Sequence, residues 1–110
     1  MSEKYQVVYS PQALDDIKGI YAYIAFSLNA VATARKQVER IRKEIRSLST
    51  MPERYVLVQW EPWNDLGLRK MAVNNFVVFY LVKKREHMVT VVRILYGGMD
   101  IDAVFQTPGQ

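Results

Sequence analysis

The sequence of 110 residues contains no cysteine, which excludes disulfide bonds and thiolate ligands for metals. It contains one histidine, His87, in a predicted turn among charged residues, so a transition-metal site is not expected. No stretch approaches the ~20 apolar residues that a membrane-spanning helix requires. The N-terminus is charged and lacks a long apolar run, unlike a signal peptide. These absences predict a cytoplasmic protein that uses no metal and has no membrane partner.

The sequence also lacks the common patterns of small-molecule catalysis. No serine lies in the sharp strand-to-helix turn that presents the nucleophile in many hydrolases. Neither a Walker pattern nor a dinucleotide-binding fingerprint surrounds Gly97-Gly98, so these glycines do not predict a phosphate loop. We therefore expect neither a cofactor nor a small-molecule substrate.

Length and composition predict a single domain over residues 1–110. A chain of this size buries a sizeable core without disulfides, and 50% of its residues are hydrophobic while 24% are charged. The 15 Lys and Arg residues against 11 Asp and Glu residues leave a net charge of +4. This modest excess favours an acidic partner, either nucleic acid or an acidic protein.

The first half of the chain predicts one strand and two helices. Residues 5–9 have the β-branched and aromatic content of a short strand. Ser10-Pro11 then supplies a helix cap and a proline suited to the first helical position. Apolar residues recur at helical spacing at Leu14, Ile17, Tyr21 and Ile24. Asn29 is the expected cap of a second helix. Its apolar stripe comprises Ala30, Ala34, Val38, Ile41, Ile45 and Leu48. The short link predicts an antiparallel helical hairpin.

The second half predicts antiparallel strands. Four segments are rich in β-branched and aromatic residues, and the first has the weakest pattern: 55–58, 68–73, 76–82 and 88–95. Asn74-Asn75 suits a tight turn because asparagine tolerates a positive φ. The order of elements predicts an α+β fold. An N-terminal strand and an antiparallel helical hairpin precede an antiparallel β-meander, and the helices pack on one face of the sheet.

The second helix carries a basic face, made of Arg35, Lys36, Arg40, Arg42, Lys43 and Arg46. Such a face can follow a phosphate backbone. The alternative is a solvated helix surface, because Glu39 and Glu44 interrupt the cations. Glu39 also precedes Lys43 by four residues, which is the spacing of an ion pair on a helix surface.

A second candidate surface is the loop that contains Trp60 and Trp63, which are separated only by Glu61-Pro62. Tryptophan offers a large rigid surface and is enriched at binding hot spots. Tryptophan is also highly buried on average, so the two indoles can equally cover the far side of the sheet. The sequence leaves both alternatives open.

Charged and aromatic residues fall on or beside the predicted strands: Arg69, Lys70, Tyr80, Arg93 and Tyr96. A charge inside a sheet must point to solvent or find a partner. If neighbouring strands bring these residues together, they form a cationic, aromatic patch on the sheet face opposite the helices. Such a patch suits RNA or an acidic, amphipathic peptide. The alternative is a set of scattered charges that protect sheet edges from aggregation.

The order β-α-α-β-β-β and four stretches of sequence resemble the RelE/ParE superfamily of bacterial type II toxins. The stretches are YQVVYSPQALDDIKGIYAYI, VERIRKEIRSLSTMPERY, LRKMAVNNFVVFYLV and VTVVRILYGGMDI, which together cover residues 5–101. The resemblance implies a small toxin that arrests growth and is neutralised by a cognate antitoxin encoded beside it. We expect an amphipathic, acidic antitoxin segment that complements the net charge.

The superfamily divides by cellular target: RelE-like members cut messenger RNA on the ribosome, and ParE-like members inhibit DNA gyrase. RelE-like toxins commonly carry an arginine where this chain has Val77. They also place a tyrosine or histidine near the C-terminus, which residues 101–110 lack. A nuclease built from this chain would have to use Arg69 and Arg93 as cations and Tyr96 as a weak acid.

The ending ILYGGMDI is closer to that of ParE-like toxins. The resemblance therefore favours non-catalytic inhibition of gyrase, with a ribosome-dependent endoribonuclease or a degenerate, non-toxic member as alternatives. It places the turn after the last strand beside the site for the target or the antitoxin. The candidate contacts are Trp60, Trp63, Arg69, Lys70, Tyr80, Arg93, Tyr96, Met99 and Asp100.

Overall fold

Two long helices and a four-stranded sheet make up most of the computed structural model, which describes residues 4–99 and 101–105. The elements are β1 (Gln6–Tyr9), α1 (Pro11–Ala22), α2 (Val31–Arg46), β2 (Arg69–Val73), β3 (Phe76–Lys83), β4 (Met88–Tyr96) and α3 (Ile101–Phe105). A π-helical turn, η1 (Tyr23–Ser27), continues α1. Two 3-10 turns, η2 (Ser47–Ser49) and η3 (Pro52–Arg54), follow α2. The predicted α+β fold is confirmed.

The strands are ordered β1-β4-β3-β2 across the sheet. The meander from β2 to β4 is antiparallel, as predicted, whereas β1 pairs with β4 in parallel, so the sheet is mixed. The predicted strand at 55–58 is wrong. This segment makes one isolated bridge to β2, between Leu57 and Arg69, and then turns so that Val58 is buried against the far side of the sheet.

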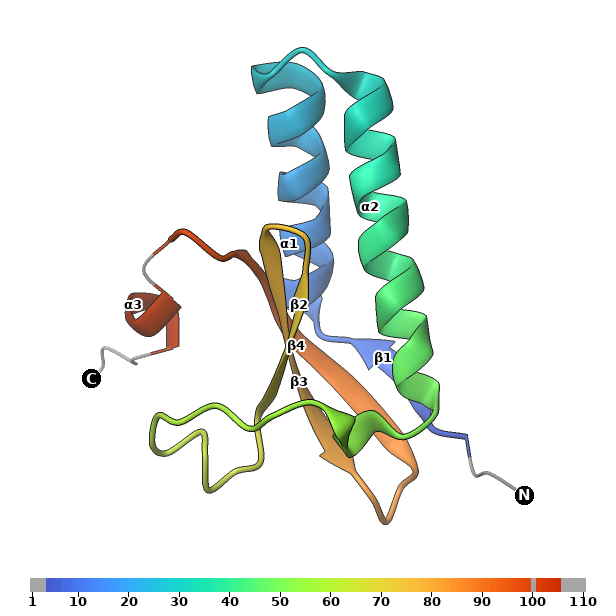
Figure 1. Cartoon of the computed structure of the whole chain (residues 1–110), viewed down its shortest axis with the longest axis vertical. Coiled ribbons are helices and arrows are strands. Elements are labelled where there is room, and N and C mark those ends of the chain that lie inside the picture. The colour runs from blue at the N-terminus through green and yellow to red at the C-terminus, as the bar shows by residue number, and fades with distance from the viewer. Residues whose placement is uncertain (1–3, 100, 106–110) are drawn as a thin grey trace.

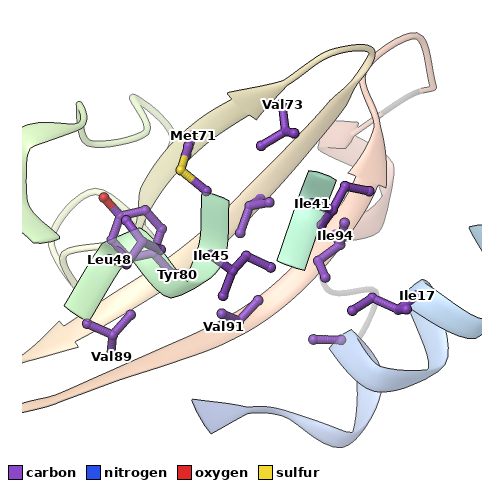
Figure 2. Packing of buried hydrophobic residues seen from close by; sticks show 12 residues of the cluster. Ile17, Ile41, Ile45, Leu48, Met71, Val73, Tyr80, Val89, Val91 and Ile94 are labelled. Atoms are coloured by element: carbon purple, nitrogen blue, oxygen red, sulfur yellow. The ribbon is translucent and has the colours of Figure 1, made fainter. Parts of the chain in front are cut away.

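The antiparallel helices α1 and α2 lie side by side (Figure 1), and they pack on one face of the sheet. Their contact with the strands forms the main core. Ile17 from α1 and Ile41 and Ile45 from α2 meet apolar side chains of β2, β3 and β4, as Figure 2 shows. The spacing of these isoleucines is that of one helix face, which is why the sequence predicted the hairpin.

The helix starts are defined by different residues. Ser10 caps α1 as predicted, because its Oγ accepts a hydrogen bond from the Ala13 N–H at 3.0 Å. The prediction for Asn29 is wrong by one position, since Ala30 occupies the N-cap of α2 and makes no side-chain cap. Asn29 instead has a φ of 55°, a left-handed conformation that turns the chain between the helices.

The far face of the sheet is covered as well, which agrees with the alternative that the two tryptophans cover it and not with an open patch on that face. The segment after 55–58 and the short helix α3 lie over it, and Phe79 and Leu95 are buried there. Trp60 packs 5.9 Å from the Phe79 ring, measured between centroids. Trp63 Nε1 donates a hydrogen bond to the Phe105 carbonyl at 3.1 Å. The half-buried tryptophans therefore cover the sheet.

A carboxylate attaches α1 to β4 where β1 ends. Strand β1 pairs with β4 only as far as Val91, so the next part of that edge has no strand beside it. Asp16 occupies this edge: Oδ2 accepts from the Ile94 N–H and from Arg93 Nε, both at 2.8 Å, and Oδ1 accepts from Arg93 Nη2 at 3.0 Å. We call this set of bonds the Asp16 clamp. It is supported by Ser10, whose Oγ donates to the Val92 carbonyl at 2.8 Å.

The clamp excludes the alternative in which Arg93 joins a patch on the sheet face opposite the helices. The pairing of β3 with β4 shifts register beside Arg93, and a bulge of this kind redirects side chains. The guanidinium reaches α1, and the side chains of Arg93 and Asp16 are only 29% and 13% exposed. The hydrogen bond to Asp16 raises the pKa of Arg93, against the opposing effect of burial.

Substitution of Asp16 tests the clamp. Asp16→Ala leaves the guanidinium and the Ile94 N–H without an acceptor, so we expect the free energy of unfolding to fall by about 2–4 kcal/mol. Urea denaturation measures this. Asp15→Ala is the matched control, because Asp15 is the exposed neighbour on the same helix, and its loss should stay within about 0.5 kcal/mol. Equal losses for the two variants would contradict the role of the clamp.

Candidate functional site

A groove of about 840 Å³ opens between α1, η1 and the ends of β3 and β4. Most of its lining is apolar. The buried or half-buried apolar members are Ile20, Ile24, Phe76, Ile94 and Leu95, and the exposed ones are Tyr23, Leu28, Tyr96 and Met99. Large exposed apolar side chains around an open groove are typical of a protein-binding surface.

Polar groups of the groove come from three elements. Asp15, Asp16 and Arg93 stand on the α1–β4 side, so the charged lining holds two carboxylates against one guanidinium. Gln37 from α2 also lines the groove: its Oε1 accepts from Asn74 Nδ2 at 3.3 Å, whereas its buried Nε2 has no partner among the described residues. A buried donor without an acceptor costs about 1–3 kcal/mol. A ligand carbonyl at this point would remove that cost.

Gly19 keeps the groove open at its α1 wall. It lies in the middle of the helix and lines the groove, and no atom lies within 4 Å of the position that a Cβ would occupy. Gly19 is therefore not a point of close contact between helices. Glycine inside a helix destabilises it by about 0.5–1 kcal/mol relative to alanine. Gly19 therefore lowers the stability of the helix at a position where any other side chain would project into the groove.

The double glycine shapes the other end of the groove. The Gly97 N–H donates to the Asn75 carbonyl at 2.8 Å, which closes the end of the β3–β4 pair. A Cβ on Gly98 would lie 2.5 Å from Cε2 of Tyr96, so any other residue here would displace that ring from its present position. Tyr96 and Met99 are 53% and 43% exposed and line the groove. Asp100 lies outside the described residues.

The predicted cationic, aromatic patch does not exist. Tyr80 is fully buried among the helix-side core residues, and its hydroxyl donates to the Pro52 carbonyl at 2.6 Å. Arg69 lies opposite Tyr80 on β2 and donates to the Tyr55 carbonyl at 2.6 Å. Both side chains point to the helix side because directly paired residues share a face, and the turns after α2 offer them carbonyl oxygens. Lys70, one residue on, is exposed.

The three residues considered for RNA cleavage do not converge. Arg69 and Arg93 stand on the two strands that flank β3, and each is held by a different acid: Glu53, at 3.8 Å from Arg69, and Asp16. Of the three, Arg93 and Tyr96 share the groove, and Arg69 is absent from it. The described residues contain no group of three potential metal ligands. In the same part of the chain, no helix has the length and apolarity to cross a membrane.

The buried Tyr80 hydroxyl generates a pH prediction. Burial raises its pKa to about 12, and the nearby Arg69 opposes this effect. Because the folded state holds the phenol proton more tightly than the unfolded state, this contribution to stability is complete below about pH 10 and declines as the pH rises towards 12. Absorbance titration of tyrosinate should show one late-ionising tyrosine, which Tyr80→Phe abolishes. Tyr23→Phe, at a position 59% exposed, should leave the late phase intact.

Several solved structures have this fold. A chain of the chromosomal ParDE TA system from P. aeruginosa matches with a TM-score of 0.69 at 20% identity, over 84% of this chain and 96% of that chain. A chain of the toxin-antitoxin complex RelBE2 from Mycobacterium tuberculosis matches with a TM-score of 0.60 at 15% identity, over 86% and 92%. A chain of the archaeal RelE-RelB complex from Pyrococcus horikoshii gives 0.60 and 15%, over 86% and 97%. At these identities the likeness shows a common fold.

The sequence identifies the family directly. No curated protein matches it. The family described as "ParE toxin of type II toxin-antitoxin system, parDE" matches residues 7–101, a span that contains both long helices, the meander and every residue that lines the groove. The predicted membership of the RelE/ParE superfamily is confirmed. The chain belongs to the ParE toxin family of type II toxin–antitoxin systems.

Proposed function

We propose that this toxin arrests growth by inhibiting DNA gyrase without catalysing a reaction, and that its antitoxin neutralises it by filling the groove beside α1. The observation that carries the proposal is the separation of the candidate catalytic side chains, together with the open apolar groove. Family membership supplies the toxin class. The mode of action is inferred from the chemistry of the site.

The hydrogen bonds that Arg69 and Arg93 make within the fold support a non-catalytic mode of action. RNA cleavage through the 2′-hydroxyl needs a base, a cation at the phosphorane and an acid for the leaving oxygen. Two nitrogen atoms of Arg93 donate hydrogen bonds to Asp16, and Arg69 donates to main-chain carbonyls. Of the three candidate residues, Tyr96 alone would have to supply both the acid and the base.

The lining of the groove supports a protein occupant. An amphipathic segment would place its apolar side chains against Ile20, Ile24 and Phe76 and would be flanked by Tyr23 and Tyr96. A main-chain carbonyl of that segment can accept from Gln37 Nε2. The solved structures with this fold include chains from toxin–antitoxin complexes, which is consistent with an antitoxin as the occupant.

The charge of the groove changes the expected chemistry of that segment. The two carboxylates outnumber the single guanidinium, so an acidic segment gains little here. We therefore infer that apolar contact provides most of the affinity in the groove, and that added salt weakens this contact only slightly. The acidic character expected from the net charge would have to act elsewhere on the surface.

A supercoiling assay tests the mode of action. Purified toxin added to gyrase and relaxed plasmid should suppress supercoiling, and prior mixing with the antitoxin encoded beside it should restore supercoiling. Messenger RNA in a translation reaction that contains the toxin should stay intact. Normal supercoiling at saturating toxin, or cut transcripts on ribosomes, would contradict gyrase inhibition and favour the nuclease alternative.

Substitution of Gly19 tests the groove. Gly19→Leu places a side chain in open space, so we expect the fold to be retained while the affinity for the antitoxin falls by at least about tenfold, equivalent to 1.4 kcal/mol. Gly19→Ala is the matched control. It should raise the free energy of unfolding by about 0.5–1 kcal/mol and weaken binding less. Calorimetric titration measures the affinity. Unchanged affinity in a folded Gly19→Leu protein would exclude the groove as the antitoxin site.

A further inference from the structure

The net charge of the chain resides on one helix. Helix α2 contains six Lys and Arg residues and two Glu residues. The whole chain has 15 basic and 11 acidic residues, so nine of each sign remain outside α2 and cancel. The charge of α2 is therefore +4, equal to the net charge of the protein. Such segregation concentrates the positive potential on one surface.

Most of these cations form no ion pair and no cation–π contact within the described part of the fold. Arg40 pairs with Glu44 at 3.6 Å, and the Arg42 guanidinium lies 5.5 Å from the centre of the Tyr9 ring. The other four form no ion pair with any described residue: Arg35, Lys36, Lys43 and Arg46. All four are exposed. We call Arg35, Lys36, Arg40, Lys43 and Arg46 the basic face of α2.

Only part of the basic face serves the stability of the helix. Only Lys43 and Arg46 lie in the last turn, where cations suit the helix dipole. Lys36 and Arg40 stand four residues apart, and so do Arg42 and Arg46, and like charges at this spacing destabilise a helix by about 0.2–0.5 kcal/mol per pair. The first turn of α2 has no acidic residue and no side-chain cap. Helix stability alone therefore does not account for the number of cations on this face.

The basic face is distinct from the groove. The core-facing side of α2 carries Ala34, Ile41 and Ile45, and Thr33 and Gln37 contribute to the groove. None of the five residues of the basic face lines the groove. Figure 1 shows α2 at the margin of the molecule with α1 on one side only. A partner on the basic face and an occupant of the groove therefore use different surfaces.

We propose that the basic face of α2 binds the phosphate backbone of duplex DNA without reading its sequence. Four cations without ion pairs lie between Arg35 and Arg46, a span of 12 residues that is about 16 Å long at a rise of 1.5 Å per residue, or about five base-pair steps at 3.4 Å each. Arginine pairs phosphate oxygens through a planar fork. The proposal places these exposed cations along the phosphate backbone and requires no base contact in the major groove.

The composition of the surface favours phosphate over an amphipathic peptide. Such a peptide needs apolar contacts beside its carboxylates. Between Ala32 and Arg46, all of which the structure describes, α2 exposes no large hydrophobic side chain. A row of cations without neighbouring apolar surface matches a polyanion, whose binding depends on the release of counterions.

Fluorescence anisotropy with the full chain and a labelled duplex of random sequence tests this proposal. We expect binding at low salt, and a plot of log K against log salt with a slope of about −3 to −4 for four cations. Lys36→Gln/Lys43→Gln should weaken binding about tenfold and bring the slope to about −2. Glu39→Gln, which removes the exposed acid within the basic face, should strengthen binding several-fold.

The matched control removes the same charge elsewhere. Lys83→Gln/Arg85→Gln neutralises two exposed cations at the β3–β4 turn and should leave affinity and slope close to those of the parent protein. Equal losses for the two double variants would show attraction by net charge alone and overturn the proposal. So would an absence of binding at low salt, or equally tight binding of an acidic peptide of matched charge. These outcomes leave the gyrase and groove experiments unaffected.

Discussion

A single carboxylate determines how the helical layer meets the sheet. Asp16 joins positions 77 residues apart in the sequence and accepts three N–H donors, two from Arg93 and one from the main chain of Ile94. Because β1 is too short to accompany β4 to its end, this carboxylate takes the place of a neighbouring strand. It thereby sets the separation of α1 from β4. The groove lies in that separation and includes Asp16, Arg93 and Ile94 in its lining.

The two candidate interaction surfaces differ in their physics. The groove is apolar with nearly balanced charge, and its occupant gains mainly from the hydrophobic effect. The basic face of α2 is polar, and α2 as a whole carries a charge equal to that of the molecule. A protein occupant of the groove and a polyanion on α2 therefore respond differently to salt. Since the surfaces do not overlap, both partners can be present on one molecule.

The features that depend on the spacing of residues close together in the sequence were predicted correctly. The isoleucine stripes predicted the hairpin, Ser10-Pro11 the start of α1, and Asn74-Asn75 the turn of the meander. The sequence did not predict the partner of Arg93, because no spacing links residues on separate elements. It also placed Tyr80 wrongly, since both faces of β3 are apolar and alternation does not reveal which one meets the helices.

The groove was not predicted from the sequence because it depends on the absence of a side chain at Gly19. Gly19 interrupts the stripe of α1 near the exposed Tyr23, and that combination was the available signal. The clamp that positions the groove has a further consequence for the order of synthesis. Asp16, which supplies the carboxylate, is translated 77 residues before Arg93, which supplies the guanidinium. Strand β1 likewise cannot pair until β4 has been translated. The groove therefore forms only after β4 has been translated, so a partner cannot bind it while the growing chain ends within the helical hairpin.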